Sequence, residues 1–272
     1  MKNNFERYRL LVVEIARLAG ERILEVYRQE FDTYKKADLS PLTEADMAAH
    51  RVITAALLAL TPDIPVLSEE AATIDYQTRA LWQRFWLVDP LDGTKEFIKR
   101  NGEFTVNIAL IEGDRPVLGV VYVPVTGVVY SASQTMGAWK QEADGAARPI
   151  RVRAYRGGKA IVAASRSHAD GAVDKFLARL RAREGEPETV NMGSSLKLCL
   201  VAEGKADIYP RLGPTCEWDT AAAQCVVEAA GGWVKDLRMH PLVYIKPSLL
   251  NPWFLAGGAG GYDWTVHLDG AG

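Results

Sequence analysis

Two carboxylates lie three residues apart in the segment WLVDPLDGTKEF, residues 86–97, at the end of an apolar stretch. Pro90 disfavours a helical conformation at the residue before it, so the chain is expected to leave the apolar strand extended through Asp89. Gly93 permits a tight turn and the close approach of a ligand. Asp89 and Asp92 can then converge on one point, where their repulsion raises a pKa or requires a cation. Oxygen ligands of this kind favour a hard ion, magnesium above all.

Four further acids bear on this interpretation, because an isolated pair with this spacing is more often a solvated turn than a metal site. Glu69 and Glu70 end a second apolar stretch, IPVLSEE. Asp219 stands at the start of an expected helix, where N-capping is its simplest role. Asp46 lies one turn into another expected helix, where the helix dipole favours an acid in any case. Taken together, the acids predict a metal centre if the fold brings them to one place.

The elements that must carry these acids follow from hydrophobic periodicity and turn residues. Helices are expected at residues 5–29 and 40–60. Two short strands that end in acids are expected at 64–70 and 85–90, and an antiparallel meander at 104–141. If a helix opens at Thr94, its N–H groups and that of Gly93 would face a phosphate.

The second part of the chain alternates strands with helices, a pattern typical of α/β layering. Strands are expected at 159–165, 188–193, 206–211 and 232–237, and helices at 171–183, 194–204 and 220–232. We therefore expect an α+β half, residues 1–150, that carries most of the acids, and an α/β half, residues 151–272, that completes the site. The glycine-rich tail, residues 257–272, is expected to be loosely held.

Composition excludes several classes of protein. The 272 residues are 48% hydrophobic, enough for a substantial core, and the net charge of -2 gives no sign of a nucleic-acid-binding surface. Three cysteines without a CxxC pair support neither a disulfide framework nor a zinc knuckle, so a reducing cytoplasm is expected. Glu14 and Arg17 interrupt the apolar run near the N-terminus, and no run reaches the roughly 18 residues of a membrane span. No integral membrane segment is therefore expected.

A family resemblance joins these motifs. DPLDGTKEF, with LSEE upstream and WDTAAAQCVVEAAGG downstream, resembles the signature set of the magnesium-dependent, lithium-sensitive phosphatases of the inositol monophosphatase superfamily. DLSPLTEAD, FIKRNGEFTVNIALIE, SRSHAD, GSSLKLCLVAEG and YPRLGPT are similar to the bacterial 3'(2'),5'-bisphosphate nucleotidase branch. The resemblance runs from about residue 8 to residue 255, and the joint occurrence of these motifs in order is specific.

The resemblance implies a fold and a metal centre. The fold would be α+β and α/β, a layered αβαβα sandwich of the inositol monophosphatase and fructose-1,6-bisphosphatase type. Two or three Mg²⁺ ions would be held, and Asp46 and Thr94 would orient the attacking water. Glu70 and Asp46 would lie around a further metal and its water. The implied metal ligands are Glu69, Asp89, the Leu91 carbonyl, Asp92 and Asp219.

The resemblance also implies a substrate, adenosine 3',5'-bisphosphate, which would lose its 3'-phosphate to give AMP and so clear a by-product of sulfate assimilation. The 3'-phosphosulfate form, PAPS, would be a second substrate. Something cationic must hold the phosphate that is not cleaved, and the candidates are Lys197 and Arg211. The hydrogen-bond donors would be Ser194, Ser195, Gly93 and Thr94. His168 could contact the base or the ribose. The substrate-binding candidates each have a plainer role: a solvated lysine, an arginine paired with an acid, a histidine that caps a helix.

Two other functions stay open. An inositol monophosphatase or a fructose-1,6-bisphosphatase-like sugar phosphatase would use the same acids, and Lys197, Arg211 and SRSHAD argue against it. A nucleotide-binding regulator on the same fold need not retain every acid, yet all are present here. A monomer and a homodimer are both compatible with the sequence. Some members of the branch are peripheral on the cytoplasmic face of the inner membrane, and nothing in this sequence shows that property.

Overall fold

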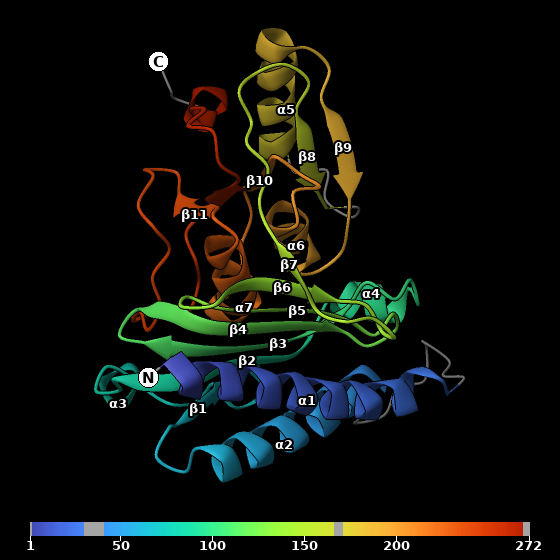
Figure 1. The fold of residues 1–272 in the computed structure, drawn as a ribbon, viewed down its shortest axis with the longest axis vertical. Coiled ribbons are helices and arrows are strands. Elements are labelled where there is room, and N and C mark those ends of the chain that lie inside the picture. The colour runs from blue at the N-terminus through green and yellow to red at the C-terminus, as the bar shows by residue number, and fades with distance from the viewer. Residues whose placement is uncertain (1, 30–40, 166–170, 269–272) are drawn as a thin grey trace.

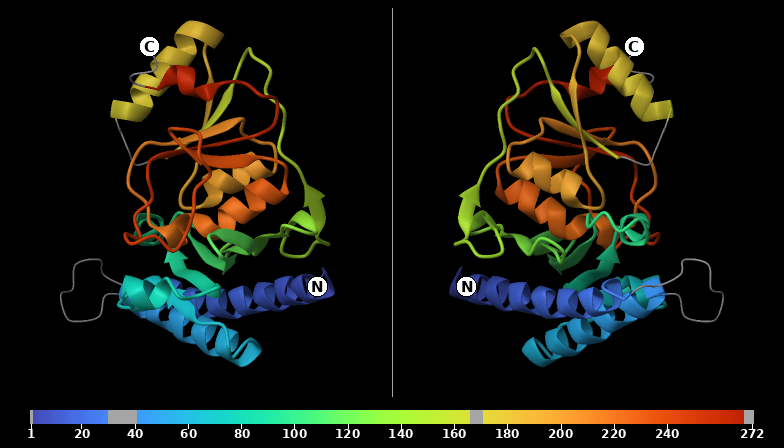
Figure 2. Two further views of the ribbon diagram at one scale, coloured as in Figure 1. Left: turned by 90° about the vertical axis from the view of Figure 1, so that its left-hand side faces the viewer. Right: turned by 90° about the vertical axis from the view of Figure 1, so that its right-hand side faces the viewer.

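Five layers, alternately helical and sheet, build the molecule in the computed structural model, which describes residues 2–29, 41–165 and 171–268 (Figure 1). An outer pair of helices covers one face of a large sheet, a second pair lies between that sheet and a smaller one, and a further helix covers the far face of the smaller sheet. Figure 2 shows the outer pair crossing beneath the large sheet from two sides. The expected αβαβα layering is confirmed.

The first sheet has seven strands within the described ranges, in the order β1-β2-β3-β4-β5-β6-β7. β1 pairs with β2 in parallel, and each later strand pairs with its chain neighbour in antiparallel orientation. The expected meander, residues 104–141, corresponds to the third to sixth strands, and one strand on each side extends it. The strands are β1 (Val66–Ser68), β2 (Arg84–Asp92), β3 (Thr105–Glu112), β4 (Arg115–Val123), β5 (Val128–Ser133), β6 (Gly137–Gln141) and β7 (Arg148–Ile150). Three short helices interrupt this half: η1 (Glu69–Ala71), α3 (Tyr76–Arg79) and α4 (Thr94–Ile98).

Both faces of this sheet are apolar, because helices cover both. Successive side chains of a strand point to opposite faces. Val88 therefore packs in the core between the sheet and the outer helices α1 (Lys2–Tyr27) and α2 (Pro41–Leu60). Leu87 packs in the core on the other face, against the helices between the two sheets. Those helices are α6 (Leu196–Ala202) and α7 (Glu217–Ala229). A Cβ on Gly119 of β4 would lie 2.3 Å from the carbonyl oxygen of Ala222. Glycine therefore allows α7 to pack closely on the sheet.

The second sheet has five strands among the described residues, in the order β11-β12-β10-β8-β9. β8 pairs in parallel with both β9 and β10, whereas β12 pairs in antiparallel orientation with both β10 and β11. α5 covers the outer face. The bounds are β8 (Ile161–Ala164), α5 (Gly171–Glu184), β9 (Glu188–Asn191), β10 (Ile208–Arg211), β11 (Trp233–Asp236), β12 (Phe254–Gly257) and η2 (Trp264–His267).

The expectation of a loosely held tail is wrong for the residues up to 268. Gly257 ends β12, which lies inside the second sheet, and Trp264 and His267 are buried. Trp264 packs with Phe176 and Leu180 of α5 in one apolar cluster. The pairing partners of so short a strand come from distant parts of the chain, so local periodicity carried no signal for it. Residues 269–272 lie outside the described part.

Candidate active site

A β-bulge at the end of β2 turns two acids to the same face of the sheet. Asp89 lies opposite Asn107 on β3 and Asp92 lies opposite Thr105, so three steps on β2 match two on β3. Residues three apart on a regular strand point to opposite faces, and the extra residue of a bulge restores a common direction. Asp89 and Asp92 therefore both face the helices between the sheets, while Leu91 packs in the core beneath α1 and α2.

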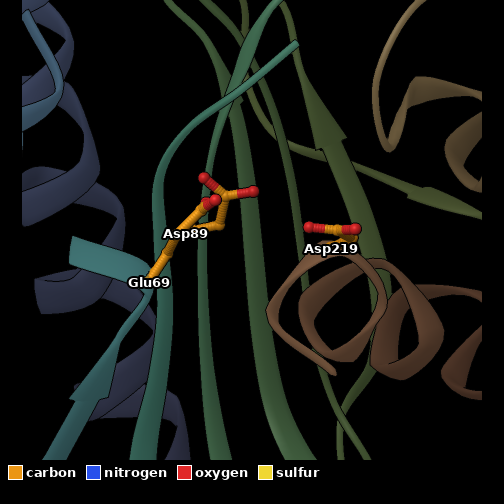
Figure 3. Close-up of side chains that lie close together, drawn as sticks. All are labelled: Glu69, Asp89 and Asp219. Carbon is orange, nitrogen blue, oxygen red and sulfur yellow. The ribbon is translucent and has the colours of Figure 1, made fainter. Parts of the chain in front are cut away.

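Three elements bring their carboxylates together at this point. β1 and β2 are parallel, with Ser68 opposite Val88, so Glu69 and Asp89 emerge at the same end of the sheet. Asp219 approaches from α7, on the other side of the space. One oxygen from each of the three acids lies within 4.8 Å of the others. Figure 3 shows the three carboxylates turned toward a common space.

Asp219 serves its helix and the acid cluster together. α7 begins at Glu217, and the N-cap residue is Cys216, so the expectation that Asp219 itself is the N-cap is wrong. Its Oδ2 instead accepts a hydrogen bond of 2.8 Å from the Cys216 backbone N–H. A carboxylate with one oxygen held in this way can direct its other oxygen to a ligand.

Asp46 reaches the same acids from α2. It is buried, and burial together with the charges of Glu70 and Glu69 raises its pKa to about 8. One turn further along α2, His50 Nδ1 lies 2.8 Å from Ser68 Oγ at the end of β1. This contact fixes α2 against the strand end that carries Glu69.

The mutual repulsion of the acids fits a site for a hard divalent cation. Burial raises the pKa of Asp89 well above its usual range, and Asp92, Glu69 and Asp219 raise it further. Burial also raises the pKa of Asp219 to about 7, with Asp92 as the next cause. Oxygen-only ligands in a partly enclosed space are what Mg²⁺ and Ca²⁺ prefer. Glu69, Asp89, Asp92 and Asp219, with the carbonyl of Leu91, are the groups that could hold such ions.

A cavity of about 310 Å³ opens from the acid cluster. Ten of the residues predicted from the sequence line it: Glu69, Asp89, Leu91, Asp92, Gly93, Thr94, Ser194, Lys197, Arg211 and Asp219. Gly93 has φ of 99°, and a Cβ there would lie 3.2 Å from both Phe104 Cα and Ser194 Cβ, so the turn requires glycine. Asp46 and Glu70 do not line this cavity. His168 lies outside the described residues.

Two cations, Lys197 and Arg211, line the same cavity. Lys197 is buried rather than solvated, and its Nζ donates hydrogen bonds to the carbonyls of Ser194 at 2.6 Å and Met192 at 3.1 Å. Burial lowers the pKa of Lys197 to about 8, an effect that Asp92 opposes and Arg211 strengthens. An ammonium group has three donors, so one remains after the two carbonyls.

Arg211 stands beside Lys197 at the end of β10. Its Nη2 donates to the Pro214 carbonyl at 2.7 Å. Its Nε is buried and has no hydrogen-bond partner among the described residues. Two neighbouring cations with donors to spare form a site that an anion would stabilise.

Of three buried polar residues next to Asp92, Ser195 was expected from the sequence as a hydrogen-bond donor to phosphate, whereas Thr105 and Asn107 were not predicted as site residues. Thr105 and Asn107 lie on β3, and Ser195 precedes α6. The Ser195 N–H donates to Asp92 Oδ2 at 2.6 Å. Burial raises the pKa of Asp92, while Lys197, this N–H and the Asn107 amide oppose the rise. The available signal was that Thr105 and Asn107 alternate in an otherwise apolar strand, which places both on one face.

In the absence of divalent cations, raising the pH from about 5 to about 8 is expected to lower the melting temperature. Asp46 and Asp219 have folded-state pKa values of about 8 and about 7, above the ordinary value of 3.8. The folded protein therefore binds more protons than the unfolded chain across this range, and its stability falls as the pH rises through the folded pKa values. Lys197, with its pKa lowered to about 8, acts in the opposite sense only above that pH.

Thermal denaturation with a chelator, and again with saturating Mg²⁺, measures this effect. Because a divalent cation binds carboxylates in their ionised form, any rise in melting temperature caused by Mg²⁺ should grow with pH. A metal-free melting temperature that stays level or rises over the range would show that the acids remain ionised without a cation.

The sequence of this chain is similar to those of known proteins over most of its length. The sequence model of the inositol monophosphatase family matches residues 6–256. The chain is 54% identical over 246 residues to the 3'(2'),5'-bisphosphate nucleotidase CysQ of Escherichia coli (strain K12), covering 89% of this chain and 96% of that protein. The same-named protein of Salmonella typhimurium (strain LT2) is 53% identical over the same length.

Solved structures agree with the sequence comparison. The crystal structure of CysQ from Bacteroides thetaiotaomicron, a bacterial member of the inositol monophosphatase family, superposes with a TM-score of 0.84 at 43% identity, covering 93% of this chain and 98% of that one. An inositol monophosphatase from Zymomonas mobilis gives a TM-score of 0.76 at 26% identity, covering 94% of each chain. Family model, sequence identity and fold thus agree, and the chain belongs to the inositol monophosphatase family.

Proposed function

We propose that the protein is a magnesium-dependent 3'(2'),5'-bisphosphate nucleotidase that removes the 3'-phosphate of adenosine 3',5'-bisphosphate to give AMP and phosphate. One observation carries the proposal: a single cavity is lined both by clustered carboxylates and by the cations Lys197 and Arg211. The names of the similar CysQ proteins support it. The substrate has two anionic groups, so it matches a cavity with two separate places for an anion.

The acid end would hold two or three Mg²⁺ ions through Glu69, Asp89, the Leu91 carbonyl, Asp92 and Asp219. When bound there, divalent ions lower the pKa of a coordinated water and neutralise charge on the leaving oxygen. The chain's own task is to hold the phosphate in line with that water. Lithium inhibition, expected from the family resemblance, belongs to the same proposal.

Asp46 and Thr94 are the residues we assign to the attacking water. Thr94 lines the cavity at the start of α4. Asp46 is buried beside Glu69 and Glu70, in a setting that raises its pKa and so favours its acceptance of a proton. In this proposal Thr94 orients the water and Asp46 takes up its proton. Glu70 is one of the acids that surround a further ion.

The cation end would bind the phosphate that is not cleaved. Among the described residues, Lys197 Nζ donates to two carbonyls, which leaves one of its three donors. The buried Nε of Arg211 has no hydrogen-bond partner among them. Ser194 and Gly93 line the same cavity. His168 remains a prediction for the base or the ribose. PAPS presents the same 3'-phosphate and a sulfated 5'-phosphate, so it is the second substrate of the proposal.

The division at residue 150 also belongs to this proposal, with the first half holding the metals and the second the nucleotide. The first sheet ends at Ile150 and the second begins at Ile161, which supports the division. Among the described residues, no helix combines the length and hydrophobicity that crossing a membrane requires. The unpaired cysteines Cys199, Cys216 and Cys225 support a reducing cytoplasm as the place of action.

A phosphate-release assay across four substrates tests the proposal: adenosine 3',5'-bisphosphate, AMP, inositol 1-phosphate and fructose 1,6-bisphosphate, each with Mg²⁺ and with chelator. We expect turnover of the adenosine bisphosphate only with Mg²⁺, with AMP as the organic product. The kcat/KM for the other three should be lower by at least about 10-fold. AMP and inositol 1-phosphate lack the second phosphate, and fructose 1,6-bisphosphate lacks the nucleoside and holds its two phosphates at a different spacing. Equal kcat/KM for inositol 1-phosphate would favour the sugar phosphatase alternative.

A further inference from the structure

Three polar side chains form a buried cluster where the two halves of the molecule meet. Thr105 and Asn107 on β3 and Ser195 before α6 are at most 4% exposed. Ser195 Oγ lies 2.8 Å from Asn107 Oδ1 and 3.0 Å from Thr105 Oγ1. Removing such groups from water is unfavourable unless they are hydrogen-bonded, and apolar side chains would fill the same space. The cluster therefore serves an orientation rather than burial alone.

The cluster leads directly to an acid of the candidate metal centre. The backbone N–H of Ser195 donates to Asp92 Oδ2 at 2.6 Å, so the residue whose hydroxyl is held by Asn107 also holds the carboxylate. The bulge in β2 leaves Thr105 opposite Asp92 and Asn107 opposite Asp89. Asn107 thus combines two positions within the cluster. It lies opposite Asp89, and it binds Ser195, which in turn holds Asp92.

The side-chain amide nitrogen of Asn107 lacks a well-placed hydrogen-bond acceptor among the described residues. Its Oδ1 accepts from the Ser195 hydroxyl, and its Nδ2 is buried without a hydrogen-bond partner by distance and angle among the described residues. The amide nevertheless interacts with the Asp92 carboxylate. A buried donor without a good partner is rare in folded proteins and calls for an explanation. A small movement of Asp92 on binding a cation would complete that bond.

We propose that Asn107 is a positioning residue, which holds Ser195 and Asp92 so that one carboxylate oxygen of Asp92 stays directed at the cation. The inference rests on the proposed metal site and adds a residue that touches neither the cation nor the substrate. Outer residues that orient a ligand in this way commonly change metal affinity 10–100-fold when they are replaced.

The arrangement has a second consequence, for the position of Lys197 relative to the acids. Ser195 immediately precedes α6, and Lys197 is the second residue of that helix. A bond from β3 to Ser195 therefore fixes the start of α6, and with it Lys197, relative to the acids of β2. Loss of Asn107 should disturb the metal site first and the cationic end second.

Asn107→Ala tests the proposal through Mg²⁺ binding, which is measured without turnover. We expect the Mg²⁺ concentration that gives half of the maximal rise in melting temperature to increase by about 10-fold or more. The variant should also show a lower kcat at low Mg²⁺, and saturating Mg²⁺ should restore part of it. The reason is that a positioning defect mainly weakens binding of the ion and has less effect on the chemical step.

Thr61→Val is the matched control for loss of a buried polar group. Thr61 Oγ1 accepts from Trp86 Nε1 at 2.9 Å and donates to the Leu57 carbonyl at 3.0 Å, at the end of β2 away from the acids. Its loss should lower the metal-free melting temperature and leave the half-saturating Mg²⁺ concentration unchanged. If Asn107→Ala behaves in the same way, Asn107 supports only the fold and the proposal is wrong.

Two further outcomes are distinguished by the same titration. If the unaltered protein shows no rise in melting temperature with Mg²⁺, the proposed function fails before the role of Asn107 is reached. If Asn107→Ala does not fold, Ser195→Ala takes its place, because it removes the hydroxyl that Asn107 holds and keeps the N–H on Asp92. An increase of about 3-fold or more in half-saturating Mg²⁺ would support the proposal, and no increase would overturn it.

Discussion

Asp89→Asn is expected to abolish both turnover and the rise in melting temperature that Mg²⁺ causes. Asp89 is 1% exposed and lies among acids that all raise its pKa, so its charge is stabilised only when a cation is present. A ligand at 100 times its Kd stabilises the native state by about 2.7 kcal/mol, which corresponds to a rise of about 5–10 °C for a protein of this size. Without metal, the variant should melt at or above the temperature of the unaltered protein, because one repelling charge is gone.

Differential scanning calorimetry with and without Mg²⁺, together with phosphate release, measures this result. Asp63→Asn is the matched control, since Asp63 is an exposed acid that precedes β1 while Glu69 follows it. The control should keep the Mg²⁺ response and the activity. An Asp89→Asn protein that retains full turnover would remove Asp89 from the metal centre. One that keeps the Mg²⁺ response and loses turnover would place the bound ion elsewhere.

Lys197→Met and Arg211→Ala are each expected to lower kcat/KM for adenosine 3',5'-bisphosphate by about 10–100-fold. A charge-assisted hydrogen bond to a phosphate contributes about 1.5–3 kcal/mol, which gives this range. Methionine is chosen for Lys197 because the side chain is 4% exposed and a shorter residue would leave a cavity. Slow hydrolysis of a monophosphate without a second anionic group should be nearly unchanged.

Steady-state kinetics on both substrates decides between the possible roles of these cations. Lys205→Met is the matched control, because Lys205 follows α6 and pairs with Glu203 outside the cavity. Equal losses on both substrates would show that Lys197 and Arg211 support the fold or the metal centre. No loss on either substrate would move the second phosphate elsewhere and favour the sugar phosphatase alternative.

The sequence predicted the local backbone that carries two of the acids. Asp89 and Asp92 stand at the end of an apolar strand, and the proline and glycine between and after them predicted an extended exit and a turn, which Gly93 makes at φ of 99°. These are local properties, because Pro and Gly restrict or free the backbone whatever surrounds them. The strands of the meander were equally local, since their partners are their neighbours in the chain.

Long-range contacts decided what local pattern could not. β12 is four residues long and becomes a strand only because β10 and β11 pair with both its edges. The tail that follows it was misjudged as loose because Trp264 is held by packing on the distant helix α5. Asp219 needed α7 to pack on the first sheet before it could meet Glu69 and Asp89. The burial of Lys197 likewise depends on the layers that surround α6.

The sequence by itself determined which residues could bind a cation or a phosphate, because charge and donor type belong to each side chain. The tertiary structure alone decided that the acids share one space, that a bulge turns Asp89 and Asp92 to the same face, and that Asn107 reaches Ser195 across the two halves. The physical reason is that convergence and burial are set by packing between distant segments. The same packing, by excluding water, raises the pKa of Asp89 and lowers that of Lys197.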